Sequence, residues 1–377
     1  MTRGKVRPTH RSTPSLLRDR TNLPGQGIHA KKKQGTQTEG QFIHLNIMPP
    51  VSQFSKTSFL VSPLSIHKGD LFCSKCHRAY RGIPVNLYDS VMAGKKIAVA
   101  IIHGIGKTPP DFAEGMKADL LRRFTNAGAN PNDLIMKSVY WSPVLQGLED
   151  ELSRRTKAGG PQGYGALREF MVSFAADAIA YQPAPHEQEI YEKVHQVVAQ
   201  ALRALAEEAG PTAPLCVIAH SLGTIVASNY FYDLQTHPRR KIIADPVETS
   251  IGDTPLDWGE TLSLFYTLGS PLALWSLRYT NFGSPLAVPA PALKHHWPAL
   301  GGEWINYYDK NDVIGYPLKT INAAYSAAVK EDRVVSVGNL FTTLTPLCHT
   351  QYWTDRNVTS PLATALVDMW KKVNPPT

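Results

Sequence analysis

The sequence predicts an α/β fold in which a mostly parallel central sheet is flanked by helices. Unbroken apolar runs of strand length recur at residues 97–102, 215–218 and 262–268, as expected of strands that are buried on both faces. Residues 187–208 place apolar side chains at helical spacing, and Gly210-Pro211 ends that pattern. Strand and helix therefore alternate along the chain, which is typical of a parallel sheet covered on both faces.

Further elements continue this alternation. Residues 134–140 and 304–308 are rich in β-branched and aromatic side chains, and residues 333–338 contain three valines. These compositions favour strands. Residues 224–234 are compatible with a helix that follows the second apolar run directly.

The segment Ala219-His220-Ser221-Leu222-Gly223 lies between that apolar run and the helix. A serine on a sharp turn from strand to helix exposes its hydroxyl at the carboxyl end of the sheet, and small residues two positions before and after it let the two backbones approach closely. Ser221 is therefore the predicted nucleophile. The alternative is that it merely caps the helix.

A serine nucleophile needs a histidine base and a carboxylate that orients it. Beyond Ser221, only His349 follows the last predicted strand, so it is the candidate base. Asp309 and Asp312 both follow the strand predicted at residues 304–308. We favour Asp312 as the acid, because Asp309 is better placed to bond the backbone of its own turn.

Two backbone N–H groups must also bind the charge that develops on the substrate oxygen. Leu222 follows the nucleophile and supplies the first. The second is assigned to Ile105, which follows His103-Gly104 at the end of the strand predicted at residues 97–102. We expect His103 and Gly104 to contact the substrate there.

These pieces, from His103-Gly104 through the serine turn and Asp312 to His349, resemble those of the α/β-hydrolase family over residues 93–377. The A-H-S-x-G turn is similar to that of bacterial lipases, and the order of the motifs, with Tyr352-Trp353 after the histidine, looks like GPI-inositol-deacylase-like esterases. The resemblance implies an esterase or lipase with a Ser-His-Asp triad. The chain departs from the pattern in having Ala219 instead of glycine and in lacking a longer HGGG-type loop.

Two segments fall outside the alternation of strands and helices. Residues 146–181 combine a charged stretch, a glycine-rich stretch and an apolar helical face that includes Phe170. They predict either a lid near the site or an ordinary packed helix. The proline-rich residues 279–302 include Trp297, which together with Phe170 is expected to line an apolar pocket for the acyl group.

The basic charge belongs to the amino-terminal residues. Residues 1–92 hold 14 Lys and Arg against 4 Asp and Glu, a net of +10, whereas residues 93–377 hold 25 against 27, a net of −2. Residues 1–92 show no sustained periodicity, so we expect a poorly ordered extension, with Met92 as an alternative start of the protein. No apolar run reaches the length of a membrane span, and a cytoplasmic protein is the default expectation.

Two other motifs suggest a bound nucleotide, haem or metal. Gly106-Lys107-Thr108 suggests a phosphate-binding loop, but Pro109-Pro110 would disrupt the helix that such a loop needs. Cys73, Cys76 and His77 match a haem-attachment signature or half of a zinc site, and we interpret the match as coincidence because no second ligand pair is nearby. No metal or organic cofactor is expected.

The sequence thus predicts a serine hydrolase that cleaves small-molecule or lipid-like carboxylic esters and has no nucleic-acid partner. The alternative is a catalytically silent scaffold of the same fold that binds a ligand or a protein through the same cleft. A covalent serine probe would separate the two.

Overall fold

The computed structural model describes residues 64–67, 70–73, 78–80, 94–105, 108–158, 176–183, 188–338 and 346–376. The chain divides into two compact units, residues 1–81 and 82–377. The first contains a three-stranded antiparallel sheet of β1 (Leu64–His67), β2 (Asp70–Cys73) and β3 (Arg78–Tyr80). The predicted boundary between residues 92 and 93 lies outside the described residues.

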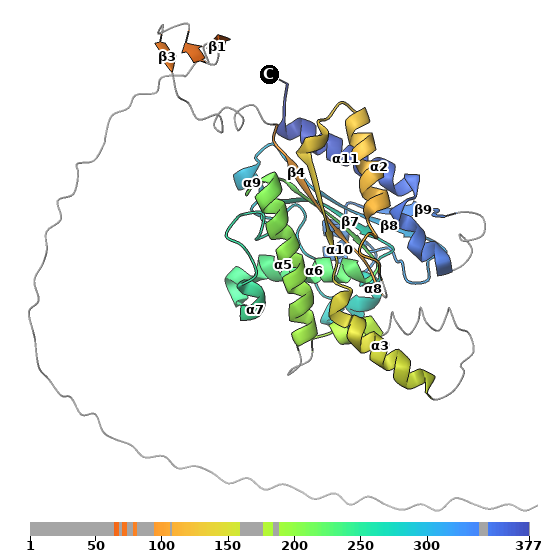
Figure 1. The fold of residues 1–377 in the computed structure, drawn as a ribbon. Helices are drawn as coiled ribbons and strands as arrows, with labels where there is room; N and C mark the ends of the chain where they lie inside the picture. The colour runs from red at the N-terminus through yellow and green to blue at the C-terminus, as the bar shows by residue number, and fades with distance from the viewer. Residues whose placement is uncertain are drawn as a thin grey trace, which may run out of the picture. The chain divides into compact units, whose positions relative to one another are not determined.

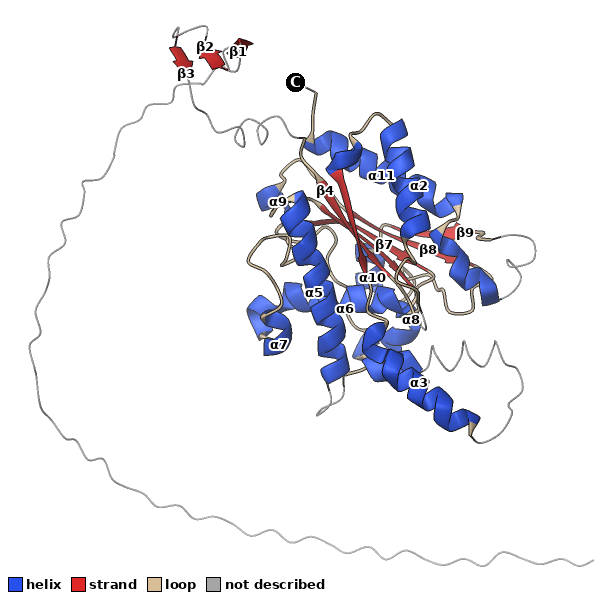
Figure 2. Ribbon diagram, in the orientation of Figure 1, coloured by secondary structure: helices blue, strands red, loops and turns tan. Residues whose placement is uncertain are grey.

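The second unit is built on a six-stranded sheet in the order β5-β4-β6-β7-β8-β9, and every neighbouring pair is parallel (Figure 2). Its strands are β4 (Ile97–Ile102), β5 (Leu134–Val139), β6 (Leu215–His220), β7 (Leu262–Leu268), β8 (Glu303–Asp309) and β9 (Glu331–Val335). The predicted parallel sheet flanked by helices is confirmed.

Helices connect the strands and cover the sheet (Figure 1). They are α2 (Glu114–Asn126), α3 (Pro143–Lys157), α5 (Glu189–Ala209), α6 (Leu222–Arg240), α7 (Asp245–Glu248), α8 (Leu272–Trp275), α9 (Leu293–His296), α10 (Ala323–Ala328) and α11 (Arg356–Val373). Short 3₁₀ helices are η1 (Pro131–Asp133), η2 (Ser276–Arg278), η3 (Thr280–Phe282) and η4 (Pro346–Trp353).

The core forms two layers, one on each face of the sheet. Successive side chains of a strand point to opposite faces, so alternate residues of β4 and β6 enter different layers. Ala98 and Val217 pack in the layer with α5 and α6, whereas Val99 and Ile218 pack in the layer with α2 and α11. Both layers exclude water from the strands, which explains why β4 is apolar throughout and why β6 is apolar up to His220 at its end.

Across the described part of the chain, the helices are too short or too polar for any of them to cross a lipid bilayer.

Candidate active site

Ser221 occupies the turn between β6 and α6, at the carboxyl end of the strand. Its φ of 53° and ψ of −131° are unusual for a residue with a side chain, and such a conformation costs on the order of 1–3 kcal/mol. Its N–H donates to the Leu268 carbonyl oxygen at 2.9 Å, which ties the turn to the end of β7. The hydroxyl is fully buried and has no hydrogen-bond partner among the described residues.

Two glycines allow the backbones to meet around this turn. A Cβ on Gly223 would lie 2.2 Å from the His103 carbonyl oxygen, and a Cβ on Gly104 would lie 2.5 Å from Ser221 Cβ. No side chain fits at either distance, so the loop after β4 rests directly on the start of α6. Gly104, which directly precedes Ile105, therefore lies beside the serine.

His349 and Asp312 form a buried hydrogen-bonded pair. His349 lies in η4 and Asp312 in the loop after β8, and the distance between His349 Nδ1 and Asp312 Oδ2 is 2.8 Å. Because a carboxylate oxygen accepts, Nδ1 carries the proton, and Nε2 is the basic nitrogen of the neutral ring. The alternative acid, Asp309, accepts instead from the amides of Asn311 at 2.9 Å and Val337 at 2.8 Å.

The charge of Asp312 is stabilised by its donors. Burial alone would raise the pKa of this carboxyl group. The hydrogen bond and charge of His349, the amide of Ile314 and the hydroxyl of Tyr352 outweigh burial and lower the pKa below its usual value. Asp312 is therefore a carboxylate at neutral pH.

His220, which precedes the serine, joins this pair to the serine turn. Its Nε2–H donates to the carbonyl oxygen of His349 at 2.6 Å, and the two rings lie 4.7 Å apart. Burial, with the nearby His349, lowers the pKa of His220 to about 3, so this donor stays neutral at physiological pH. Gly269, which directly follows Leu268, is also adjacent to the pair: a Cβ there would lie 2.7 Å from Asp312 Oδ2 and 3.1 Å from His349 Nδ1.

His103 shapes the loop that carries Ile105. Its Nδ1–H donates to the Gly104 carbonyl oxygen at 2.8 Å, and its Nε2 accepts the N–H groups of Trp141 at 3.0 Å and Ser142 at 3.1 Å. A peptide is planar with C=O and N–H on opposite sides, so holding the Gly104 carbonyl fixes the direction of the Ile105 N–H.

The ring of His103 is therefore not placed to bind substrate, contrary to the sequence prediction. Both ring nitrogens bond backbone groups, the ring stacks on Trp141 at 4.8 Å, and only 1% of the residue is exposed. Burial lowers the pKa of His103 to about 4, although the hydrogen bond to Gly104 opposes this shift. The ring is therefore neutral at neutral pH. Orienting the loop is the role that these contacts support.

Trp297, one of the two residues predicted to line an acyl pocket, is not brought to the site. The Trp297 indole N–H donates to the Thr212 carbonyl oxygen at 2.6 Å, and Lys95 lies 5.1 Å from the centre of the ring. Thr212 precedes β6 and Lys95 precedes β4, so Trp297 lies at the amino edge of the sheet, opposite Ser221. Phe170 lies outside the described residues, as does the rest of residues 159–175 of the predicted lid.

Sequence reasoning missed the roles of His220, Trp141 and Tyr352. Trp141 holds His103 through its backbone and indole N–H groups, and the Tyr352 hydroxyl donates to Asp312 at 2.9 Å. The available signal was position in the sequence. His220 directly precedes Ser221, Trp141 follows the strand predicted at residues 134–140, and Tyr352 lies three residues after His349. Position alone does not reveal which atom each side chain bonds.

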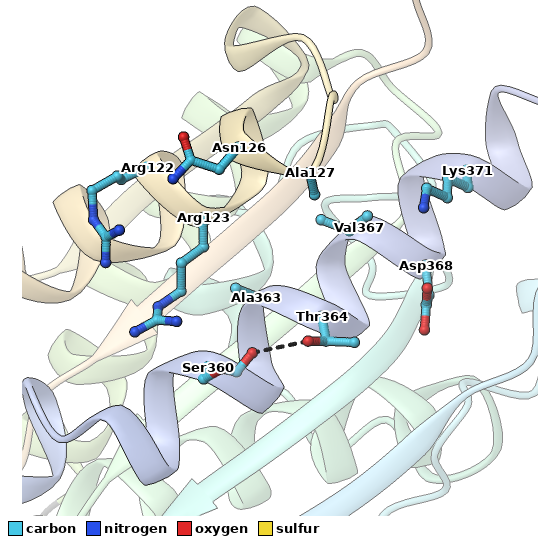
Figure 3. Close-up of a pocket in the computed structure, with 10 residues that line it drawn as sticks. All are labelled: Arg122, Arg123, Asn126, Ala127, Ser360, Ala363, Thr364, Val367, Asp368 and Lys371. Atoms are coloured by element: carbon cyan, nitrogen blue, oxygen red, sulfur yellow. Dashed lines mark hydrogen bonds between the residues drawn. The ribbon is translucent and has the colours of Figure 1, made fainter.

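A separate concavity of about 450 Å³ lies between α2 and α11 (Figure 3). Arg122 and Arg123 line it from α2, and Thr364 and Lys371 line it from α11. Both arginines already pair with Asp119. None of its lining residues belongs to the candidate site, so we assign it no part in the chemistry.

Among the described residues, no three His, Cys, Asp or Glu side chains are grouped to hold a metal ion. Cys73 lies in β2, whose side chains are not described, and Cys76 and His77 lie outside the described residues.

Comparison with protein-family models finds no match, and no curated protein matches the sequence. Solved structures match this chain at low sequence identity. A predicted CIB-like hydrolase from Thermoplasma acidophilum is 10% identical, with a TM-score of 0.31, over 74% of this chain and 89% of its own. The esterase domain of a Rhodothermus marinus protein is 11% identical, with a TM-score of 0.30, over 75% and 88%. A Pyrobaculum calidifontis esterase is 12% identical, with a TM-score of 0.32, over 74% and 78%.

These three proteins are described as hydrolases or esterases, and none of them as a GPI-inositol-deacylase-like protein.

Proposed function

We propose that the protein is a serine hydrolase that cleaves carboxylic esters through Ser221, His349 and Asp312. The observation that carries the proposal is the buried 2.8 Å bond between His349 Nδ1 and Asp312 Oδ2, next to a strained serine turn. A buried imidazole whose Nδ1 proton is held by a carboxylate presents Nε2 as a base, which is the arrangement that activates a serine hydroxyl.

The reaction would proceed in two half-reactions. Ser221 Oγ attacks the ester carbonyl carbon while its proton passes to His349 Nε2, and Asp312 stabilises the resulting imidazolium. The amides of Leu222 and Ile105 bind the oxyanion, and each such donor typically lowers the barrier by about 3 kcal/mol. His349 then protonates the leaving alcohol, and a water molecule releases the acid from the acyl-enzyme by the same steps.

Two buried histidines orient the groups that take part in the proposed reaction. His103 orients the Ile105 amide, and His220 holds the backbone of His349. The start of α6 favours negative charge at the serine turn, because helix N-termini carry partial positive charge. The substrate class, a small-molecule or lipid-like ester, comes from the resemblance to esterases and lipases. Neither a lid formed by residues 146–181 nor a role for Phe170 is needed for this chemistry, and both remain predictions.

Hydrolysis of a series of p-nitrophenyl esters by the whole protein tests the proposal. We expect turnover of at least one chain length, and its loss in Ser221→Ala, because covalent catalysis through Oγ is then impossible. A folded wild-type protein that hydrolyses no ester, or a Ser221→Ala variant with undiminished turnover, would refute it. The first outcome would favour the silent scaffold.

A further inference from the structure

Tyr352 lies on the same 3₁₀ helix as His349, three residues further along. Its hydroxyl donates to Asp312 Oδ2 at 2.9 Å and accepts the Asp309 N–H at 2.8 Å. The side chain is fully buried. The element that carries the proposed base therefore also carries a donor to the proposed acid.

The carboxylate of Asp312 is held by three donors. Oδ2 accepts from His349 Nδ1 at 2.8 Å as well as from Tyr352, and Oδ1 accepts the Ile314 N–H at 3.1 Å. A Cβ on Gly269 would lie 2.7 Å from Oδ2 and 2.8 Å from Tyr352 Cε2, so the packing here is tight. If the Tyr352 hydroxyl were removed, a water molecule could not take its place without displacing these groups.

From this geometry we propose that Tyr352 is a positioning residue, which acts on the reaction by fixing the orientation and the hydrogen-bonding capacity of Asp312. The proposal rests on the proposed function. Two effects follow from the phenolic donor. It prevents the carboxyl group from rotating away from His349, and it draws charge from the oxygen that faces the imidazole.

Other titratable groups also face this pair. They are His220 at the end of β6, Asp309 at the end of β8, and Cys348 on η4. Burial raises the pKa of Cys348 to about 11 and lowers that of His220 to about 3, so both are neutral between pH 5 and 9. A change in pH dependence on removing the Tyr352 hydroxyl would therefore not come from His220 or Cys348, and the bond between Asp312 and His349 is the contact that this hydroxyl supports.

The test compares Tyr352→Phe with Tyr230→Phe in the full chain. Tyr230 is also buried, but its hydroxyl has no hydrogen-bond partner among the described residues. For Tyr352→Phe we expect kcat to fall about tenfold at nearly unchanged KM, since one charge-assisted hydrogen bond is lost. We also expect the acid limb of the pH–rate profile to move upward by about half a pH unit, because a carboxylate with fewer donors binds a protonated imidazole more strongly.

Tyr230→Phe should change neither quantity. If kcat and the acid limb of Tyr352→Phe match those of Tyr230→Phe, the hydroxyl has only a structural role and the proposal is overturned, whatever happens to the melting temperature.

Proton NMR supplies a readout that does not depend on turnover. The far-downfield resonance of the imidazole Nδ1–H, identified by its loss in Asp312→Asn, should show a nuclear Overhauser effect to Tyr352 in the wild type and should shift in Tyr352→Phe. If neither is seen, the proposal fails even if the protein is an esterase. If both are seen in a protein that hydrolyses no ester, the proposed function fails while the bond from Tyr352 to Asp312 stands.

Discussion

At the scale of single residues, the choice between two aspartates decides which side chain completes the proposed triad. Asp309 and Asp312 are both buried and lie three positions apart, yet their partners differ in kind. Asp309 bonds two backbone amides and closes its own turn, whereas Asp312 bonds the imidazole of His349. The proposed chemistry therefore requires Asp312 and makes Asp309 structural.

Asparagine at each position tests this difference. Asp312→Asn should lower kcat by about 10³- to 10⁴-fold, because the amide cannot stabilise the imidazolium or hold the required tautomer. Asp309→Asn keeps an oxygen acceptor and should lower stability while leaving kcat within a few-fold. Steady-state kinetics and thermal melts of both variants check the expectation. Equal losses of kcat would contradict the assignment of the acid.

The proposed triad and His103 show which parts of the candidate site could be predicted from the sequence and which could not. Ser221, His349 and Asp312 were predicted because the proposed chemistry demands a fixed order along the chain, and the structure brings His349 and Asp312 into contact. His103 was assigned to substrate, but its ring nitrogens bond backbone groups. Which way a ring points depends on packing against residues distant in sequence, here Trp141, and no local pattern records that.

At the scale of elements, the site depends on the close approach of the loop after β4 to the start of α6. Gly223 lies at that contact, where any Cβ would lie 2.2 Å from a backbone oxygen and 2.9 Å from the Ile102 oxygen. Backbone atoms cannot rotate away as a flexible side chain can. The two elements would have to separate to admit a methyl group.

Gly223→Ala should therefore destabilise the protein by about 2 kcal/mol or more, because overpacking against backbone forces the elements apart. It should also lower kcat, because the Ile105 amide moves with the loop. Gly147→Ala in α3 is the matched control: nothing lies within 4 Å of its added methyl group, and helix propensity should stabilise it by up to about 1 kcal/mol. Urea denaturation and ester hydrolysis measure both effects. Equal stability of the two variants would contradict the proposed contact.

Elements with strong patterns were predicted closely, whereas placements that depend on tertiary contacts were not. The apolar run at residues 97–102 coincides with β4, because a strand buried on both faces must be apolar throughout. The last strand spans Glu331–Val335, whereas residues 333–338 were predicted. Its polar start lies in a partly buried part of the sheet, and its pairing with β8 ends at Val335. Trp297 was placed at the wrong end of the sheet because an aromatic residue in a proline-rich loop can pack against either edge.

At the scale of the whole molecule, a partly buried polar cluster links α5 and α6. The Tyr191 hydroxyl donates to Asp233 Oδ2 at 2.6 Å, and Tyr181 bonds His195 at 2.9 Å. Burial raises the pKa of Asp233 to about 6, although the bond from Tyr191 opposes this, and burial lowers the pKa of His195 to about 3.

Because the pKa of Asp233 is raised in the folded protein, we expect the free energy of unfolding to depend on pH through this group. Well below pH 4 the group is protonated in both states, and as the pH rises through 4 towards 6 the unfolded state loses its proton first. The free energy of unfolding of the wild type should therefore fall across this window relative to Asp233→Asn, by about 2–3 kcal/mol for a shift of about two units. Asp253→Asn, at an exposed aspartate, is the control and should run parallel to the wild type. Denaturation at pH 4, 5, 6 and 7 measures the difference, and a constant offset for Asp233→Asn would contradict it.

The most direct measurement of the central claim is covalent labelling of the whole protein with a fluorophosphonate, followed by peptide mass spectrometry. A serine activated by His349 beside two oxyanion donors should react, and the adduct should map to Ser221 and be absent from Ser221→Ala. A folded wild-type protein that remains unlabelled, or an adduct on another residue that persists in Ser221→Ala, would contradict the account.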